Sequence, residues 1–134
     1  MQLFILLSWL ISFFVQEPFL VLLASLQVNG ISKEIILALA NCKYPYEILF
    51  IDDGSTDDTL AQIKALSATD SKVKFIELSR NFGHQNALKA GLDMCNADII
   101  IMMDCDLQHP PYLIIELLKN YELGYEIVRT HRID

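Results

Sequence analysis

The sequence has few basic residues, and those it has are scattered. Lys and Arg total 10 of 134 residues against 17 Asp and Glu, which gives a formal net charge of −7. Nucleic-acid binding is therefore excluded, because binding to a phosphate backbone needs concentrated positive charge. An acidic protein that handles an anionic substrate needs local positive charge, which a bound metal ion usually supplies.

Cysteine is also scarce. Cys42, Cys95 and Cys105 are odd in number and form neither a Cys-x-x-Cys nor a Cys/His spacing. This pattern argues against a disulfide framework and against a structural zinc site. We expect three small, buried or half-buried thiols in a reducing compartment.

The N-terminal 26 residues are strongly apolar and lack a basic residue, the first being Lys33. An apolar run at 3–15 is broken only by Ser8 and Ser12, and a second run covers 19–26. The first run is shorter than a typical membrane span, and a signal peptide usually begins with positive charge. Three readings stay open: a buried element, a membrane-embedded or interfacial hairpin, or a cleaved signal.

From residue 46 onward, short apolar runs alternate with helical patterns. Apolar strands that alternate with helices indicate a parallel sheet covered on both faces, and 53% apolar residues are ample for its core. The sequence therefore predicts an α/β fold. The predicted strands are 47–51, 73–78, 98–104 and a fourth opening at 126–128, and the predicted helices are 57–67, 84–95 and 112–123.

Polar residues follow each of the first three predicted strands. Asp52 and Asp53 follow the first, the Ser-Arg-Asn of 79–81 follows the second, and Asp104 and Asp106 follow the third. Ligands of open α/β sheets bind at the carboxyl ends of the strands. Parallel topology therefore predicts that these clusters share one edge.

Two of these clusters suggest specific chemistry. Asp104 and Asp106, with Gln108 two residues further, offer oxygen ligands for Mg²⁺ or Mn²⁺, or else they cap the loop and the next helix. Asp52 and Asp53 either accept hydrogen bonds from a base or ribose, or cap the helix that follows. By position, Arg132 is either a phosphate partner or an ordinary surface residue, and His84 and His109 are assigned no role. The list of candidate site residues is thus Asp52, Asp53, Asp104, Asp106, Gln108 and Arg132.

Taken in order, these motifs resemble family 2 glycosyltransferases of the dolichyl- or polyprenyl-phosphate sugar synthase type. The resemblance implies the GT-A fold, a three-layer sandwich with a mainly parallel, Rossmann-like sheet. The matching stretches are Tyr-Glu-Ile-Leu-Phe-Ile-Asp-Asp-Gly-Ser-Thr-Asp at 46–57, Leu-Ser-Arg-Asn-Phe-Gly-His-Gln at 78–85, Ala-Gly-Leu-Asp at 90–93 and Asp-Cys-Asp-Leu-Gln-His-Pro-Pro at 104–111.

The resemblance also implies a role for each matching residue. Asp53 would contact the base of the nucleotide, with Asp52 beside it. Asp104 would be the catalytic aspartate, close to the sugar and the diphosphate. Asp106 and Gln108, with Asp104 beside them, would hold Mg²⁺ or Mn²⁺. Arg132 would contact phosphate.

The activity implied is transfer of a hexose from a UDP- or GDP-sugar to a polyprenyl or dolichyl phosphate, with inversion at the anomeric carbon. Such an enzyme would work at the cytoplasmic face of a membrane. A receiver-type phospho-acceptor domain is a less favoured alternative, because it leaves the motifs at 78–85 and 106–111 unexplained.

Both ends of the chain depart from the family pattern. Residues 11–17 begin like the family's first strand but lack its Pro and its Tyr-Asn pair, and the family's later segments would follow residue 134. We therefore expect a poorly matched apolar segment at 1–45 and an incomplete catalytic domain at 46–134. A truncated remnant that has lost turnover is accordingly a second hypothesis.

Overall fold

The computed structural model describes residues 5–7, 19–24, 28–104 and 110–130. In this part of the chain the strands form one sheet of five, in the order β1-β5-β2-β3-β4. The strands are β1 (Ile5–Leu7), β2 (Phe19–Ala24), β3 (Tyr46–Asp52), β4 (Val73–Glu77) and β5 (Ile99–Asp104), and the helices are α1 (Val28–Ala38), α2 (Thr59–Thr69), α3 (His84–Met94) and α4 (Leu113–Glu122).

The four longer strands run parallel, so their carboxyl ends meet at one edge. β2 pairs with β3 on one side and with β5 on the other, and β3 pairs with β4. Ala24 of β2 lies opposite both Ile51 of β3 and Asp104 of β5, while Asp52 lies opposite Glu77 of β4. Only β1 runs antiparallel, beside β5.

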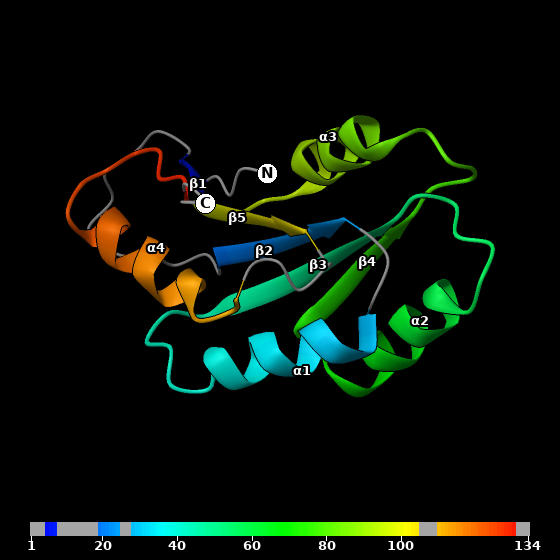
Figure 1. Ribbon diagram of the computed structural model, residues 1–134, viewed down its shortest axis with the longest axis horizontal. Coiled ribbons are helices and arrows are strands. Elements are labelled where there is room, and N and C mark those ends of the chain that lie inside the picture. The colour runs from blue at the N-terminus through cyan, green and yellow to red at the C-terminus, as the bar shows by residue number, and fades with distance from the viewer. Residues whose placement is uncertain (1–4, 8–18, 25–27, 105–109, 131–134) are drawn as a thin grey trace, which may run out of the picture.

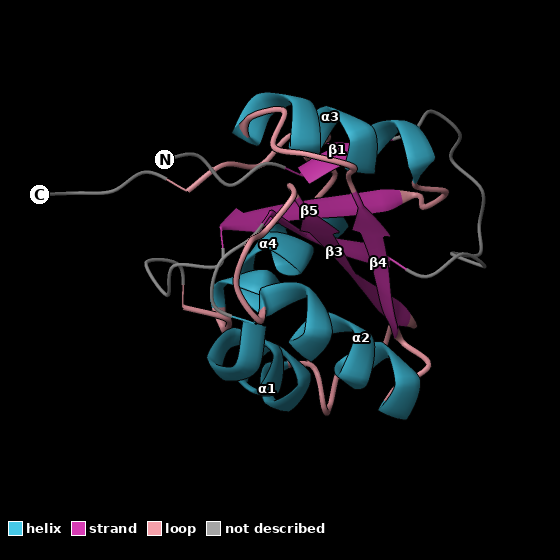
Figure 2. Ribbon diagram, turned by 90° about the vertical axis from the view of Figure 1, so that its right-hand side faces the viewer, coloured by secondary structure: helices cyan, strands magenta, loops and turns pink. Residues whose placement is uncertain are grey.

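Helices cover both faces of the sheet, which makes three layers (Figure 2). Alternate residues of β3 point to opposite faces, as the pleat requires. Ile48 and Phe50 lie in the larger core, under α1, α2 and α4, whereas Leu49 and Ile51 pack with Ala87 of α3 in the smaller one. The predicted α/β sandwich with a mainly parallel sheet is confirmed.

Most predicted elements after residue 46 are confirmed within one or two residues. The strand predicted at 126–128 is wrong, because those residues form no strand and Ile127 is 65% exposed. β5 itself pairs with β2 on one side and with β1 on the other, so neither of its sides is open to a further strand. Gly124, with a φ of 93°, lies in the turn after α4, where glycine is favoured.

The apolar N-terminal segment contributes directly to the sheet. β2 comes from the second apolar run and is hydrogen-bonded on both sides, and β1 comes from the first. The structure therefore makes these residues strands of the sheet, while 8–18 lie outside the described residues. The predicted boundary at residue 45 therefore falls between elements that share one sheet. None of the described helices is both long enough and apolar enough to cross a bilayer.

Candidate functional site

The carboxyl edge of the sheet gathers the candidate residues that the structure describes. Asp52 is the last residue of β3 and Asp104 the last of β5, with only β2 between those strands. The loops from β3 to α2 and from β4 to α3 leave the sheet at this same edge (Figure 1). The edge predicted from parallel topology is therefore present.

Asp52 is buried at this edge with one oxygen unused. The residue is only 1% exposed, and its Oδ2 accepts a hydrogen bond from the Ser55 backbone N–H at 3.2 Å. Its Oδ1 is buried and has no hydrogen-bond partner within the described structure. A buried carboxylate oxygen without a donor is costly, so its retention needs an explanation.

Both carboxylate oxygens of Asp53, the next residue, accept hydrogen bonds from backbone N–H groups. Its Oδ1 accepts a hydrogen bond from the Phe82 N–H at 2.7 Å, and its Oδ2 accepts one from the Gly83 N–H at 2.9 Å. Gly83 immediately precedes α3. Asp53 therefore ties the loop after β3 to the loop after β4.

Gly54 lets these two loops come into backbone contact. Its φ of +69° lies in the left-handed region that favours glycine. A Cβ at this position would lie 2.5 Å from the Arg80 carbonyl carbon and 2.6 Å from the Asn81 nitrogen. No other residue type fits between the loops without moving one of them.

Neither Asp52 nor Asp53 caps α2, although that was one of the two readings. The Thr59 N–H at the start of α2 donates instead to Asp57 Oδ1 at 3.0 Å. Hydrogen bonds with Thr59 hold the pKa of the Asp57 carboxyl below its usual value. Asp57, rather than Asp52 or Asp53, therefore supplies the side-chain hydrogen bond at the start of α2.

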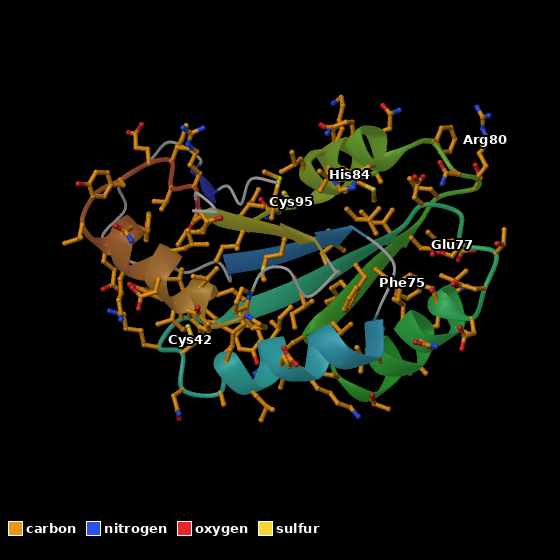
Figure 3. The ribbon with its side chains drawn as sticks, in the orientation of Figure 1. Cys42, Phe75, Glu77, Arg80, His84 and Cys95 are labelled. Carbon is orange, nitrogen blue, oxygen red and sulfur yellow. The ribbon has the colours of Figure 1, made fainter. Side chains whose placement is uncertain are left out.

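The remaining candidates are less fully described. The backbone of Asp104 is placed in β5, whereas Asp106, Gln108, His109 and Arg132 lie outside the described residues. Over the described ranges, no cluster of three or more His, Cys, Asp or Glu side chains is arranged to hold a metal ion. His84 is exposed at the start of α3, and Arg80 lies at the outer tip of the preceding loop (Figure 3).

Sequence reasoning missed the backbone amides of Phe82 and Gly83 as partners of Asp53. The available signal was the glycine at 83, which directly precedes a predicted helix. An unpaired N–H group at that point attracts a carboxylate.

A model of the family described as "Glycosyl transferase family 2" matches residues 32–133. The chain belongs to glycosyl transferase family 2. This assignment displaces the receiver-type alternative, which would have required phosphoryl-transfer chemistry at the same aspartates.

Curated relatives share much of the sequence of this family 2 chain. CsbB of Bacillus subtilis (strain 168), provisionally named a glycosyltransferase, is 54% identical over 92 residues, which are 69% of this chain and 28% of the relative. An undecaprenyl-phosphate 4-deoxy-4-formamido-L-arabinose transferase of Pseudomonas fluorescens (strain SBW25) is 41% identical over 97 residues, covering 69% and 28%. The chain thus spans under a third of their length.

Solved structures show the GT-A fold for this family 2 chain. TarS residues 1–349 of S. aureus superimpose with a TM-score of 0.60 at 21% identity, over 79% of this chain and 32% of that one. The mannosyltransferase PcManGT of Pyrobaculum calidifontis, solved with GDP-Man and Mn²⁺, gives 0.55 at 20% identity, over 67% and 28%. The predicted fold is confirmed.

Proposed function

We propose that this chain forms the donor-binding core of a glycosyltransferase that moves a hexose from a UDP- or GDP-sugar to a polyprenyl phosphate, with inversion. Family membership supports sugar transfer. The undecaprenyl-phosphate transferases among its relatives support a lipid phosphate as acceptor. The observation that carries the proposal furthest is the buried, unpartnered oxygen of Asp52 at the carboxyl edge.

Asp53, with Asp52 beside it, forms the pair that we assign to the nucleotide base, and Asp52 contributes an oxygen without a partner. Its free Oδ1 can accept a hydrogen bond, and uracil and guanine both offer a ring N–H as the donor. Asp53, which the resemblance pointed to, accepts one backbone N–H on each of its oxygens and keeps a second lone pair on each for a ligand. Binding a base at Asp52 would satisfy an acceptor that is otherwise desolvated without compensation.

Asp104, Asp106 and Gln108 are the residues that would hold a divalent ion. Carboxylate and amide oxygens suit Mg²⁺ or Mn²⁺, and Asp104 ends the strand next but one to β3, on the same edge as Asp52. When bound, such an ion neutralises charge on a diphosphate leaving group. In this proposal Asp104 is the catalytic aspartate near the sugar, and Arg132 contacts phosphate.

The acceptor phosphate needs little help from a general base, because it is already ionised at neutral pH. The chain's contribution is then to orient the donor and to keep the leaving group at the carboxyl edge. A polyprenyl acceptor requires the enzyme to work at a membrane surface, and a nucleotide-sugar donor favours its cytoplasmic face.

Calorimetric titration with UDP and with GDP, each with and without Mn²⁺, tests the donor site. We expect one nucleotide to bind more tightly with Mn²⁺ present, and Asp52→Asn to weaken that binding by about tenfold or more, the loss of one charged hydrogen bond. Asp70→Asn is the matched control, since Asp70 accepts the Lys72 backbone N–H at the opposite end of β4.

Each outcome of the titration has a distinct meaning. Failure of a folded chain to bind either nucleotide would refute the donor site. Unchanged affinity in Asp52→Asn would refute the assignment of the base to this residue. Transfer of labelled sugar to polyprenyl phosphate then tests the complete activity, and binding without transfer would favour the non-catalytic hypothesis.

A further inference from the structure

The two faces of the sheet are covered unequally. Among the described helices, α1, α2 and α4 lie on one face and α3 lies on the other (Figure 2). The larger core has thirteen buried residues, whereas the smaller core beneath α3 has three, Leu49, Ile51 and Ala87. A sheet face needs a packed layer to bury its apolar residues. The described elements therefore leave part of the α3 face without such a layer.

The uncovered part holds a pocket at the amino ends of β3 and β4, beside the last turn of α3. Its volume is about 250 Å³, and it is lined by Glu47, Leu49, Lys74 and residues 94–97. Leu49 lies opposite Lys74 in the sheet, and Glu47 lies two residues before Leu49. Because side chains alternate along a strand, these three share the α3 face. The pocket is thus at the opposite end of the strands from the proposed donor site.

An apolar side chain stands at the rim of this pocket. Met94, the last residue of α3, is 70% exposed. Leu49, Ala97 and the thiol of Cys95 give the pocket apolar walls. An exposed apolar side chain beside an apolar hollow is self-complementary, because two copies related by a twofold axis can each place Met94 in the pocket of the other. The flexible thioether of methionine adapts well to such irregular gaps.

Glu47 and Lys74 add charge complementarity to the same surface. They are diagonal neighbours on paired strands, and neither forms an ion pair with another described residue. The surface therefore carries one unpaired charge of each sign. A second copy related by a twofold axis offers an opposite charge to both groups at once.

We propose that this surface, formed by Glu47, Lys74, Met94 and the pocket beside them, is the contact between two copies of the chain. In the pair, Met94 of each copy enters the pocket of the other, and Glu47 of each copy faces the partner's Lys74. The interface goes beyond the proposed donor site and does not rest on it. Because it lies at the amino ends of the strands, away from Asp52, both donor sites stay open in the pair.

Sedimentation equilibrium of the full chain tests the interface. We expect the mass to approach that of two copies as the concentration rises toward about 1 mM. Met94→Lys should raise the dissociation constant by about tenfold or more, because a charge then enters an apolar pocket twice in each pair. Leu37→Lys is the matched control, since Leu37 is 74% exposed on α1, on the other face of the sheet, and should leave the constant unchanged.

Charge reversal separates this surface from any other contact. Glu47→Lys and Lys74→Glu should each weaken association, since like charges then face one another, and the double reversal should restore it. A chain that stays monomeric up to about 1 mM would overturn the proposal. A pair that Met94→Lys leaves intact, or a double reversal that associates no better than the single variants, would overturn it equally.

A measurement on the unmodified chain covers the case in which a variant does not fold. Cys95 lines the pocket on the α3 face, whereas Cys42 packs against the larger core on the other face, and both are half-buried (Figure 3). Alkylation by excess iodoacetamide, followed at each thiol by mass spectrometry, should slow at Cys95 as the chain concentration rises and stay constant at Cys42. The same response at both thiols would overturn the interface.

Discussion

Replacing Gly54 with alanine should destabilise the chain more than any other single-methyl addition at a positive-φ glycine. The new Cβ would lie 2.5 Å from the Arg80 carbonyl carbon, whereas ordinary contacts begin at 3.4 Å. One loop must therefore retreat by about 1 Å, the difference between those two distances. Gly124→Ala is the matched control, since its φ is +93° and nothing lies within 4 Å of its Cβ.

The magnitude follows from two separate costs. A left-handed backbone at a non-glycine residue costs about 1 kcal/mol, and both variants incur it. A retreat of about 1 Å also takes the two Asp53 hydrogen bonds, 2.7 and 2.9 Å long, out of bonding range. Because the Phe82 bond is solvent-exposed, about 1 kcal/mol each is appropriate. Gly54→Ala should then cost about 3 kcal/mol and Gly124→Ala about 1 kcal/mol.

Urea unfolding measures the difference. With a slope of about 2 kcal/mol per molar urea, the midpoint of Gly54→Ala should fall about 1 M below that of Gly124→Ala. The slope itself should stay constant, since neither change alters the surface exposed on unfolding. Equal midpoints for the two variants would refute the main-chain contact between the loops.

Three further predictions concern stability. Asp52→Asn should raise the free energy of unfolding of nucleotide-free protein by about 1 kcal/mol, because it replaces a buried carboxyl group that has an unpartnered oxygen; a fall in urea midpoint would contradict this. The hydrogen bond from Lys43 holds the pKa of Glu122 below 4.5, so its stabilisation is complete above that pH and is lost as pH falls through the lowered pKa. The melting temperatures of wild type and Glu122→Gln should therefore differ at neutral pH and converge in acid, and a constant difference would count against the pair. Phe50→Ala should cost about 3–5 kcal/mol because Phe50 is fully buried, whereas Leu37→Ala at an exposed position should change stability by less than about 0.5 kcal/mol.

The elements after residue 46 were predictable because their local signals agree with the tertiary structure. The run at 48–51 is apolar throughout, which a strand covered on both faces requires, and the structure buries Ile48 and Ile51 on opposite sides of it. The small residues Ala87 and Gly91 allow a helix to pack closely, and both are buried in α3. In each case pattern and environment point the same way.

Two assignments failed or stayed open because they depend on partners distant in sequence. β2 reads as an apolar run compatible with several structures, and only its pairing with both β3 and β5 makes it a central strand. Glu126 to Val128 has strand-forming residues, but a strand also needs a partner, and these three residues pair with no strand of the described sheet. Local strand propensity does not specify which strands pair with one another in the folded sheet.

The adjacent pair Asp52 and Asp53 shows where residue chemistry stops specifying a role. Both are aspartates in one motif, so composition and spacing treat them alike. The pleat turns successive side chains to opposite faces, which sends Asp52 into the protein beyond Phe50 and leaves Asp53 beside the β4–α3 loop. Because Asp52 is buried, its unpaired oxygen costs free energy. The Asp53 carboxylate instead accepts the backbone N–H groups before α3 and so connects the loop after β3 to the loop after β4. The different surroundings of the two carboxylates therefore follow from the geometry of the strand end, which their residue type does not encode.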